Sequence, residues 1–387
     1  MHSIRALRLL PLLLLAGAAL LGARGRGGPA VPVIVPLDAR PLYPPTRLAW
    51  SAAHGLVALV TDGESRRPVL YRAGARGEDW RRWAELPLSA GEGDTELVLA
   101  GDEALIFGAR EDRILIIRLA LADAAPSAPS GFPPGVPRID TLAAGAPIVS
   151  LAADASPPDS AGGPAVHLAY LVRPAGEEGR SILYRRSADG GATWAPPDTL
   201  AFGDVEGPAL FARSERANIV DLCYRRNAFM TWRGSGDQGL FWRDERPIRL
   251  AAARGSHNAV ARRDNQVLVI CENELHQVAG STSLNHGYNW ERAIAVAREA
   301  RHLRMPALDC GGGLFWVAYS AGDSMVVLRS ASDTALPSQW HGGINVAAVC
   351  TQGRPDVVAL PDSTAGLLYG TPSGEVYFAR VRQPARP

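Results

Sequence analysis

Residues 187–194 read SADGGATW, a cluster of small and polar residues closed by tryptophan, directly after the strand-like run SILYRR. Gly, Asp and Ser form tight turns, because glycine adopts positive φ freely and an Asp side chain hydrogen-bonds to its own turn. Similar octets follow at 235–242, SGDQGLFW, and at 283–290, SLNHGYNW. The turn therefore belongs to an internal repeat, and the repeat decides the fold.

The repeat has a period near fifty residues. Its tryptophans, Trp194, Trp242, Trp290 and Trp340, stand 48, 48 and 50 residues apart. Short runs rich in Val, Leu and Tyr lie before each tryptophan, with turn residues between them, and this pattern is typical of antiparallel strands. Each unit is thus predicted to be a four-stranded meander.

Units of this kind open near Arg47, Glu96, Pro147, Pro208, His257 and Met305. A seventh, PDVVALP, GLLYG and EVYFARV, has only three strands, and the N-terminal run VPVIVPLD has the composition of the missing one. We therefore expect an all-β fold, a β-propeller of four-stranded antiparallel blades, as one domain over 31–387 and closed by an N-terminal strand. Seven blades fit best and six are the alternative. The segment RAIAVAREARHL at 292–303 then becomes strand and loop rather than helix.

Each octet residue has a local role. Asp189 is expected to accept hydrogen bonds from its own turn, Gly191 to supply positive φ, and Trp194 to bury its ring against the blade. The turn joins the third and fourth strands of a unit, so it lies on the face opposite the loops between units. We expect a structural role for the octet residues, which are Ser187, Asp189, Gly191, Thr193, Trp194, Ser235, Asp237, Gly239, Trp242, Ser283, Asn285, Gly287 and Trp290.

Composition narrows the class of protein. The 387 residues are 47% hydrophobic and 20% charged, and 40 basic residues balance 39 acidic ones, for a net charge of +1. Such a chain is globular and has no basic field to attract nucleic acid or an anionic membrane. We therefore expect no nucleic-acid partner.

The N-terminus predicts an extracytoplasmic location. Within residues 1–30, Arg5 and Arg8 precede an apolar run from Leu9 to Leu21 that small residues follow, as in a secretory signal peptide. The run is short for a membrane span, and an uncleaved N-terminal anchor is the alternative. We expect the mature chain to be secreted, periplasmic or at the cell surface.

Cysteine spacing does not predict a metal site. The cysteines, Cys223, Cys271, Cys310 and Cys350, follow the repeat and show no metal-ligand spacing. We expect neither a metal nor a cofactor, and the disulfide pattern stays open.

The octets carry a resemblance to a known family. SADGGATW is similar at every defined position to S-x-D-x-G-x-T-W, the Asp box of the bacterial neuraminidase repeats (BNR) in sialidases. The resemblance implies a sialidase-like propeller with an arginine opening its first strand, which Arg47 in TRLAW matches. It also implies a Glu ahead of a middle blade and a following Arg-Asn, which Glu206 and Arg226-Asn227 match. The C-terminal RPDVVALPDSTAGLLYG resembles the last blade of the family, but Arg354 stands where the family has its nucleophilic tyrosine.

That departure bears on catalysis. The family uses a tyrosine activated by a Glu, an Asp as acid and base, and three arginines that bind the substrate carboxylate. A guanidinium stays protonated and cannot act as a nucleophile. The resemblance therefore implies a degenerate catalytic set, in which Glu206 remains, Tyr224 is the nearest replacement nucleophile, and Asp62 stands near the place of the acid and base.

Candidates for ligand binding lie on the face away from the octets. We expect Arg47, Arg226, Arg354, Asp356 and His257 to bind a ligand there. The same loops carry further polar residues, Arg110, Glu111, Arg173, Arg225, Glu272 and Arg304.

Three functions are compatible with this pattern. The first is a non-catalytic propeller that binds a glycan, an acidic small ligand or a protein partner through its Arg-rich loop face. The second is a glycoside hydrolase of exo-sialidase type with a rearranged active site, and the third is an assembly or scaffold propeller. Because the nucleophile is missing, we favour binding over catalysis. Membrane contact is expected only through an uncleaved leader.

Overall fold

The structure is a computed structural model. It describes residues 33–37, 47–61, 67–88, 95–121, 137–158, 163–213, 218–253, 257–297, 303–322, 325–332, 340, 343–347, 354–371 and 375–383.

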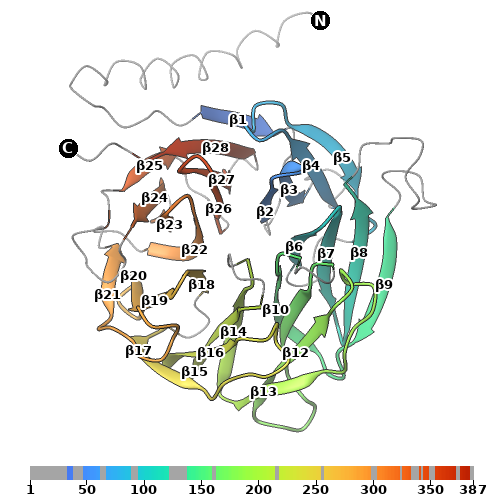
Figure 1. Cartoon of the computed structure of the whole chain (residues 1–387), viewed down its shortest axis with the longest axis vertical. Helices are drawn as coiled ribbons and strands as arrows, with labels where there is room; N and C mark the ends of the chain where they lie inside the picture. Colours follow the sequence, from blue (N-terminus) through green and yellow to red (C-terminus); the bar gives the residue numbers. More distant parts are fainter. Residues whose placement is uncertain are drawn as a thin grey trace, which may run out of the picture.

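Seven antiparallel sheets of four strands form a ring, which is a seven-bladed β-propeller (Figure 1). Blade 1 consists of β2 (Arg47–Ser51), β3 (Gly55–Thr61), β4 (Pro68–Ala73) and β5 (Arg81–Glu85). Blade 2 consists of β6 (Thr95–Ala100), β7 (Glu103–Arg110), β8 (Arg113–Ala120) and β9 (Arg138–Ala143). Blade 3 consists of β10 (Ile148–Ala155), β11 (Val166–Val172), β12 (Arg180–Ser187) and β13 (Asp198–Gly203). Blade 4 consists of β14 (Val205–Phe211), β15 (Val220–Arg226), β16 (Phe229–Ser235) and β17 (Arg246–Ala251). Blade 5 consists of β18 (Asn258–Arg263), β19 (Gln266–Glu272), β20 (Val278–Ser283) and β21 (Ile294–Ala297). Blade 6 consists of β22 (Leu303–Gly311), β23 (Leu314–Ala321), β24 (Met325–Ala331) and β25 (Ile344–Ala347).

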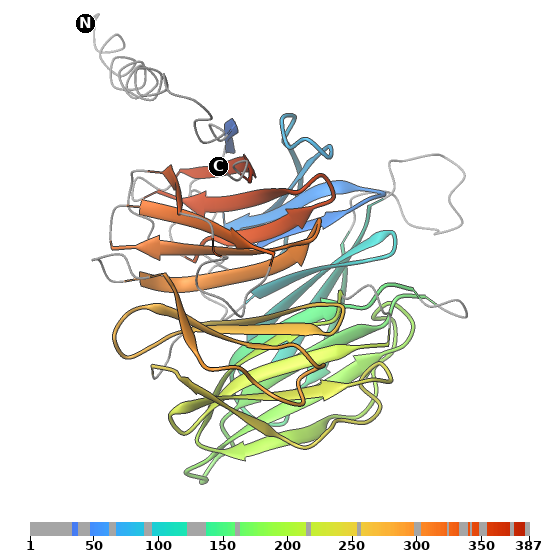
Figure 2. The same ribbon diagram turned by 60° about the vertical axis from the view of Figure 1, so that its left-hand side comes forward.

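Blade 7 joins the two ends of the chain. It consists of β26 (Asp356–Leu360), β27 (Thr364–Gly370), β28 (Val376–Arg382) and, at its outer edge, β1 (Val33–Leu37). β1 pairs antiparallel with β28, with Val33 opposite Arg380 and Leu37 opposite Val376. Both views show blade 7 beside blade 1 (Figures 1 and 2). The predicted seven blades and the N-terminal closing strand are confirmed, and the six-bladed alternative is excluded.

Unit boundaries fall within a few residues of their predicted positions. The largest shift is in blade 4, where β14 begins at Val205 and not near Pro208. The pairing of β14 with β15 has a register shift between Glu206 and Ala209, where Gly207 has φ 55°, and the strand continues through this irregularity. In the segment 292–303, Ile294–Ala297 is a strand, as predicted, and residues 298–302 lie outside the described part.

The core lies between the blades. The middle strands β11 (VHLAYLV) and β23 (LFWVAYSA) are buried at every position, because each sheet is covered on both faces by its neighbours. Trp232 and Trp316 are among the largest fully buried side chains. No helix in the described residues is long and apolar enough to span a membrane.

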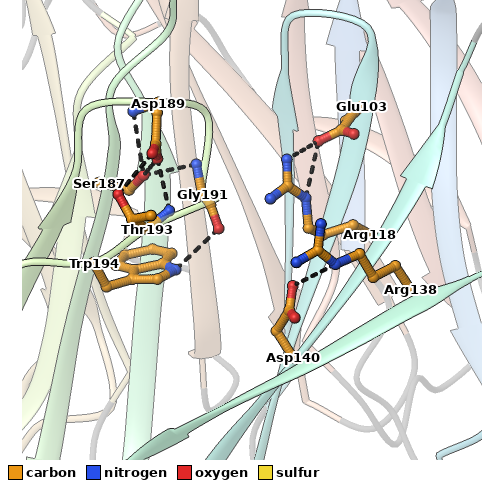
Figure 3. Close-up of polar contacts among 9 residues, drawn as sticks. All are labelled: Glu103, Arg118, Arg138, Asp140, Ser187, Asp189, Gly191, Thr193 and Trp194. Carbon is orange, nitrogen blue, oxygen red and sulfur yellow. Dashed lines mark hydrogen bonds and ion pairs between the residues drawn. The ribbon is translucent and has the colours of Figure 1, made fainter. Parts of the chain in front are cut away.

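The octet turns have hydrogen bonds of the predicted kind, which Figure 3 shows for the turn of blade 3. The Ser187 hydroxyl donates to Asp189 (2.7 Å), the Gly191 N–H donates to Ser187 Oγ (2.7 Å), and the Thr193 N–H donates to Asp189 Oδ1 (2.8 Å). Partial burial opposes ionisation of Asp189, but these bonds, above all those from Thr193, hold its pKa at about 2. Gly191 has φ 89°. We call these turns the boxes.

The boxes of blades 4 and 5 also pack against the preceding blade. The Trp242 ring meets Tyr184 of blade 3 edge-on, with centroids 4.9 Å apart, and Trp290 meets Trp232 of blade 4 at 5.9 Å. A Cβ at Gly239 would overlap the Tyr184 hydroxyl. The box glycine is therefore required twice, by its positive φ and by the side chain of the neighbouring blade.

Carboxylates link neighbouring inner strands as well. Three of them accept a backbone N–H of the next blade: Asp154 from Ala212 at 2.9 Å, Asp309 from Ala359 at 2.8 Å, and Asp356 from Leu48 at 2.6 Å. A buried ion pair joins blades 4 and 5, where Arg262 donates to both oxygens of Asp221 at 2.6 and 2.7 Å. The ring is thus held by polar as well as apolar contacts between blades.

Candidate functional site

A cavity of about 1000 Å³ occupies the centre of the ring, lined by the innermost strand of the blades. Figure 1 shows these strands, β2, β6, β10, β14, β18, β22 and β26, around the axis. We call the face on which these strands begin the mouth face, and the opposite one the box face. The cavity runs from Arg47, at the start of β2, to Ala53, beyond its end.

At the mouth, Arg47 is held by Glu96 of blade 2. Its Nε and Nη2 donate to the two carboxylate oxygens at 2.8 and 3.0 Å. Both side chains are mostly buried, at 10% and 17% exposure. The bidentate pair fixes the guanidinium plane in the cavity wall.

Glu206 is held in the same way by two arginines. Arg180, which opens β12, donates to Oε1 at 2.7 Å, and Arg225 of β15 donates to Oε2 at 3.4 Å. Glu206 lies directly opposite Arg225 in the register of β14 and β15. Both oxygens of Glu206 are thus engaged with guanidinium groups.

Three further predicted residues line the cavity: His257, Arg354 and Asp356. His257 is exposed, and the other two are half-buried. Asp356 also accepts the N–H of Leu48, so it holds blade 7 against blade 1. The structure therefore brings Arg47, Glu206, His257, Arg354 and Asp356 to one cavity.

Tyr224 and Arg226 lie elsewhere. Tyr224 is fully buried in the core between blades 3 and 4, and burial, together with the Glu245 carboxylate, raises its pKa well above the ordinary range. Arg226 donates to Glu245 at 2.7 Å and to the Phe202 carbonyl at 3.1 Å. Neither residue lines the cavity. Arg225 is the residue of β15 that lies opposite Glu206, and alternation along the strand turns Tyr224 and Arg226 to the other face of the sheet. Asp62 lies outside the described residues, and so does the side chain of Arg304.

Arg213 crosses the box-face end of the cavity. It follows β14 and donates to Asp154 of blade 3 at 3.1 Å, and its Nη2 lies 3.5 Å from Asp309 of blade 6. Both acids are nearly buried, at 8% and 5% exposure. Burial raises the pKa of Asp309, and the Arg213 charge opposes that rise. One guanidinium thus ties two nearly opposite blades across the channel.

Charges in the lining balance. The described lining residues include four arginines (Arg47, Arg180, Arg213, Arg354) and four carboxylates (Glu96, Asp154, Glu206, Asp356). Between the two polar ends the wall is apolar, with Ala49, Val98, Ala152, Val260 and Leu308. Such a site can bind through fixed N–H donors and oxygen acceptors above an apolar wall. Among the described residues, no group of three or more His, Cys, Asp or Glu is placed to hold a metal ion.

Sequence reasoning missed Glu96, Arg180 and Arg213 as site residues. Glu96 stands at the start of the second unit, the same repeat position as Arg47, and that equivalence was a usable signal. Arg180 begins a third strand and Arg213 follows a first strand, and only the closed ring shows that both reach the cavity.

The cysteines in the described part of the chain form no disulfide bond. Cys223, Cys271 and Cys310 are free thiols, and Cys350 lies outside the described residues. Burial raises the pKa of Cys271 to about 12, so this thiol is not activated.

Comparison with solved structures gives lectins and sialidases with β-propeller folds. The BP39L lectin from Burkholderia pseudomallei matches with a TM-score of 0.64 and 12% identity over 89% of this chain and 98% of that chain. An Aleuria aurantia lectin matches with a TM-score of 0.50 and 11% identity over 78% and 96%. The NanB sialidase from Streptococcus pneumoniae gives 0.47 and 11% over 91% and 70%. At these identities the likeness shows the fold alone. No protein-family model matches the sequence, and no curated protein matches it.

Proposed function

We propose that the protein is an extracytoplasmic, non-catalytic propeller that binds a neutral glycan at the mouth of its central cavity. Residues 1–30 serve in this proposal as signal peptide or anchor. The observation that carries it is the mutual pairing of the charges at the mouth, Arg47 with Glu96 and Arg180 with Glu206. The proposal rests on this site and not on the fold, since one fold hosts many functions.

Paired charges suit sugar hydroxyls. A guanidinium and a carboxylate in a fixed pair still present N–H donors and oxygen lone pairs, and a hydroxyl group can use both at once. The lining has no excess of positive charge to favour an acidic ligand, because its four arginines meet four carboxylates. A neutral glycan therefore fits better than a sialylated one.

The same pairing argues against hydrolysis. A general base needs an oxygen that is placed to take up a proton from water or from a nucleophile. Both oxygens of Glu206 accept from arginines, and Tyr224 is buried away from the cavity. These positions support binding without turnover.

The test uses the purified protein on an array of neutral and sialylated glycans, and on fluorogenic sialosides. We expect binding of neutral glycans without product release, and a loss of affinity of about tenfold or more in Arg180→Ala, since that change removes a charge-assisted donor. Arg226→Ala is the matched control, because this arginine lies on the same face but outside the cavity. It should keep wild-type affinity.

Three outcomes would overturn the proposal. Turnover of a sialoside that is lost in Glu206→Gln would identify a hydrolase. Binding confined to sialylated glycans would show that the balance of charge does not decide the ligand. If the protein bound no glycan at all, the assembly or scaffold function would be favoured instead.

A further inference from the structure

Four large apolar side chains are exposed on the box face of blades 4 and 5. They are Leu240 and Phe241 in the box of blade 4, at 61% and 79% exposure, and Leu284 and Tyr288 in the box of blade 5, at 45% and 53%. The guanidinium of Arg243, which follows the first box, lies 4.8 Å above the Tyr288 ring and joins the two turns. We call these four side chains the apolar patch.

The box turn itself does not require these residues. The box of blade 3 makes the same hydrogen bonds with Ala188, Ala192 and Thr193 at the corresponding positions. Large apolar groups at exposed positions in two adjacent boxes therefore call for a reason other than turn formation.

Backbone groups within the patch are already satisfied. Gly239 donates its N–H to Ser235 Oγ at 2.8 Å, and Phe241 donates to Asp237 Oδ1 at 2.9 Å. In the next box, the Asn289 N–H donates to Asn285 Oδ1 at 2.8 Å. Covering these turns with another surface would leave those N–H groups paired, so the desolvation cost is low.

Charges beside the patch are balanced. Arg243 and Asp244 follow the first box tryptophan, Glu291 and Arg292 follow the second, and all four are exposed. An anionic lipid surface would favour an excess of arginine here. The order is base then acid after the first box, and acid then base after the second. This arrangement suits a two-fold contact, in which each arginine meets a carboxylate of the other copy.

The size of the patch agrees with such a contact. The four side chains expose roughly 400 Å², a patch large enough to mark an interaction site. Two patches with their charged borders approach the roughly 1,200 Å² of small specific interfaces.

We propose that the apolar patch is a two-fold interface with a second copy of this chain. The boxes lie on the face opposite the cavity mouth, so the two mouths of the dimer point to opposite sides. If the proposed glycan binding holds, the dimer bridges two glycan-bearing surfaces and does not bind twice to one. The dimer itself does not depend on that function.

The first test measures the mass of the purified protein by sedimentation equilibrium between 1 and 100 µM, a range set about typical affinities of small interfaces. We expect twice the 41.1 kDa of one chain at the upper end. The double variant Phe241→Ser, Tyr288→Ser should weaken the dimer about a hundredfold, because it removes the two aromatic anchors. Phe229→Ser is the matched control, since Phe229 is 51% exposed but lies on the mouth face. Every variant carries the same N-terminal segment, so association through that segment would not distinguish them.

A second test exchanges the charges. An acidic patch, Arg243→Glu with Arg292→Glu, and a basic patch, Asp244→Arg with Glu291→Arg, should each give monomers. Mixed in equal amounts, the two variants should form a heterodimer.

A monomer at 100 µM, a dimer unaffected by the double serine variant, or two charge variants that remain monomeric when mixed would each overturn the proposal. So would a monomeric protein that sediments with phosphatidylcholine or phosphatidylserine vesicles through Phe241. Glycan binding is measured separately on the array, so failure of the dimer and failure of the proposed function are distinguishable.

Discussion

His167 is a buried residue whose titration should change the stability of the whole fold. It occupies the position in β11 that Asp221 occupies in β15, fully buried between the Ser156 hydroxyl at 2.8 Å and the Tyr184 hydroxyl at 2.7 Å. Burial, aided by the Arg186 charge, lowers its pKa from 6.5 to about 3. The imidazole is therefore neutral in the folded protein at pH values where it is protonated in the unfolded chain.

Stability should consequently fall as the pH drops from 6.5 toward 3, because the unfolded state binds the proton first. The slope from this residue is about 1.4 kcal/mol per pH unit. Urea unfolding between pH 6.5 and 5, above the range of most carboxylates, measures it. His167→Gln should remove most of the slope, and a variant that keeps it would contradict this assignment.

Some residue roles can be predicted from the sequence and others cannot, depending on where their contacts come from. The roles of Ser187, Asp189 and Gly191 follow from chemistry within one turn, and the octet contains all of it. Glu206 and Tyr224 differ: their surroundings come from Arg180 and from the core between blades 3 and 4. The alternation of β15 does indicate that Tyr224 and Arg225 face opposite ways, but not which of them contacts Glu206.

At the scale of elements, the boxes act between blades as well as within a hairpin. Gly239 lies against Tyr184 of the preceding blade, and Gly287 lies against Trp232. The sequence predicts the glycine through its positive φ, which is a property of the turn. The neighbouring aromatic could not be predicted, since it is one blade away along the chain.

Replacing a box glycine should lower the free energy of unfolding for two reasons, backbone strain and overlap with the neighbouring blade, and these can be measured separately. Gly239→Ala should lower the free energy of unfolding by about 3 kcal/mol, from strain at φ 78° and from overlap with Tyr184. Gly190→Ala is the control, because it has φ 66° with nothing within 4 Å of the added Cβ, and it should cost about 1 kcal/mol. Equal losses in urea unfolding would show that the contact between blades contributes nothing.

At the scale of the whole molecule, the repeat made the ring predictable. Period, strand composition and the three-stranded last unit together predicted seven blades and their closure. The cavity was predictable only in part, because Arg47 and Glu206 follow from their positions at the starts of inner strands, whereas Arg213 reaches Asp309 across the closed ring.

Arg213 should matter to the stability of the entire ring. In Arg213→Met, Asp154 and Asp309 remain buried without their guanidinium, which should cost about 3 kcal/mol at pH 7. Burial already raises the folded-state pKa of Asp309, and loss of the Arg213 charge should raise it further, so the deficit against wild type should shrink as the pH falls toward 4. Urea unfolding at pH 7 and 4.5 measures both quantities.

Arg380→Met is the control for this change. Its partner Asp362 is 43% exposed, and an exposed pair should contribute less than about 1 kcal/mol. A deficit in Arg213→Met that does not change with pH would exclude the two acids as its cause.

The pairing of β1 with β28 also sets an order of events in synthesis. Val33 in β1 and Arg380 in β28 are separated along the chain by the strands of six blades, so the two strands cannot meet until those blades have been synthesised. Until then the outer edge of every partial ring stays open, and such an edge can pair with another chain. The last step of folding is therefore the one that removes the risk of aggregation, and a chain that stops before β28 should need a chaperone to remain soluble.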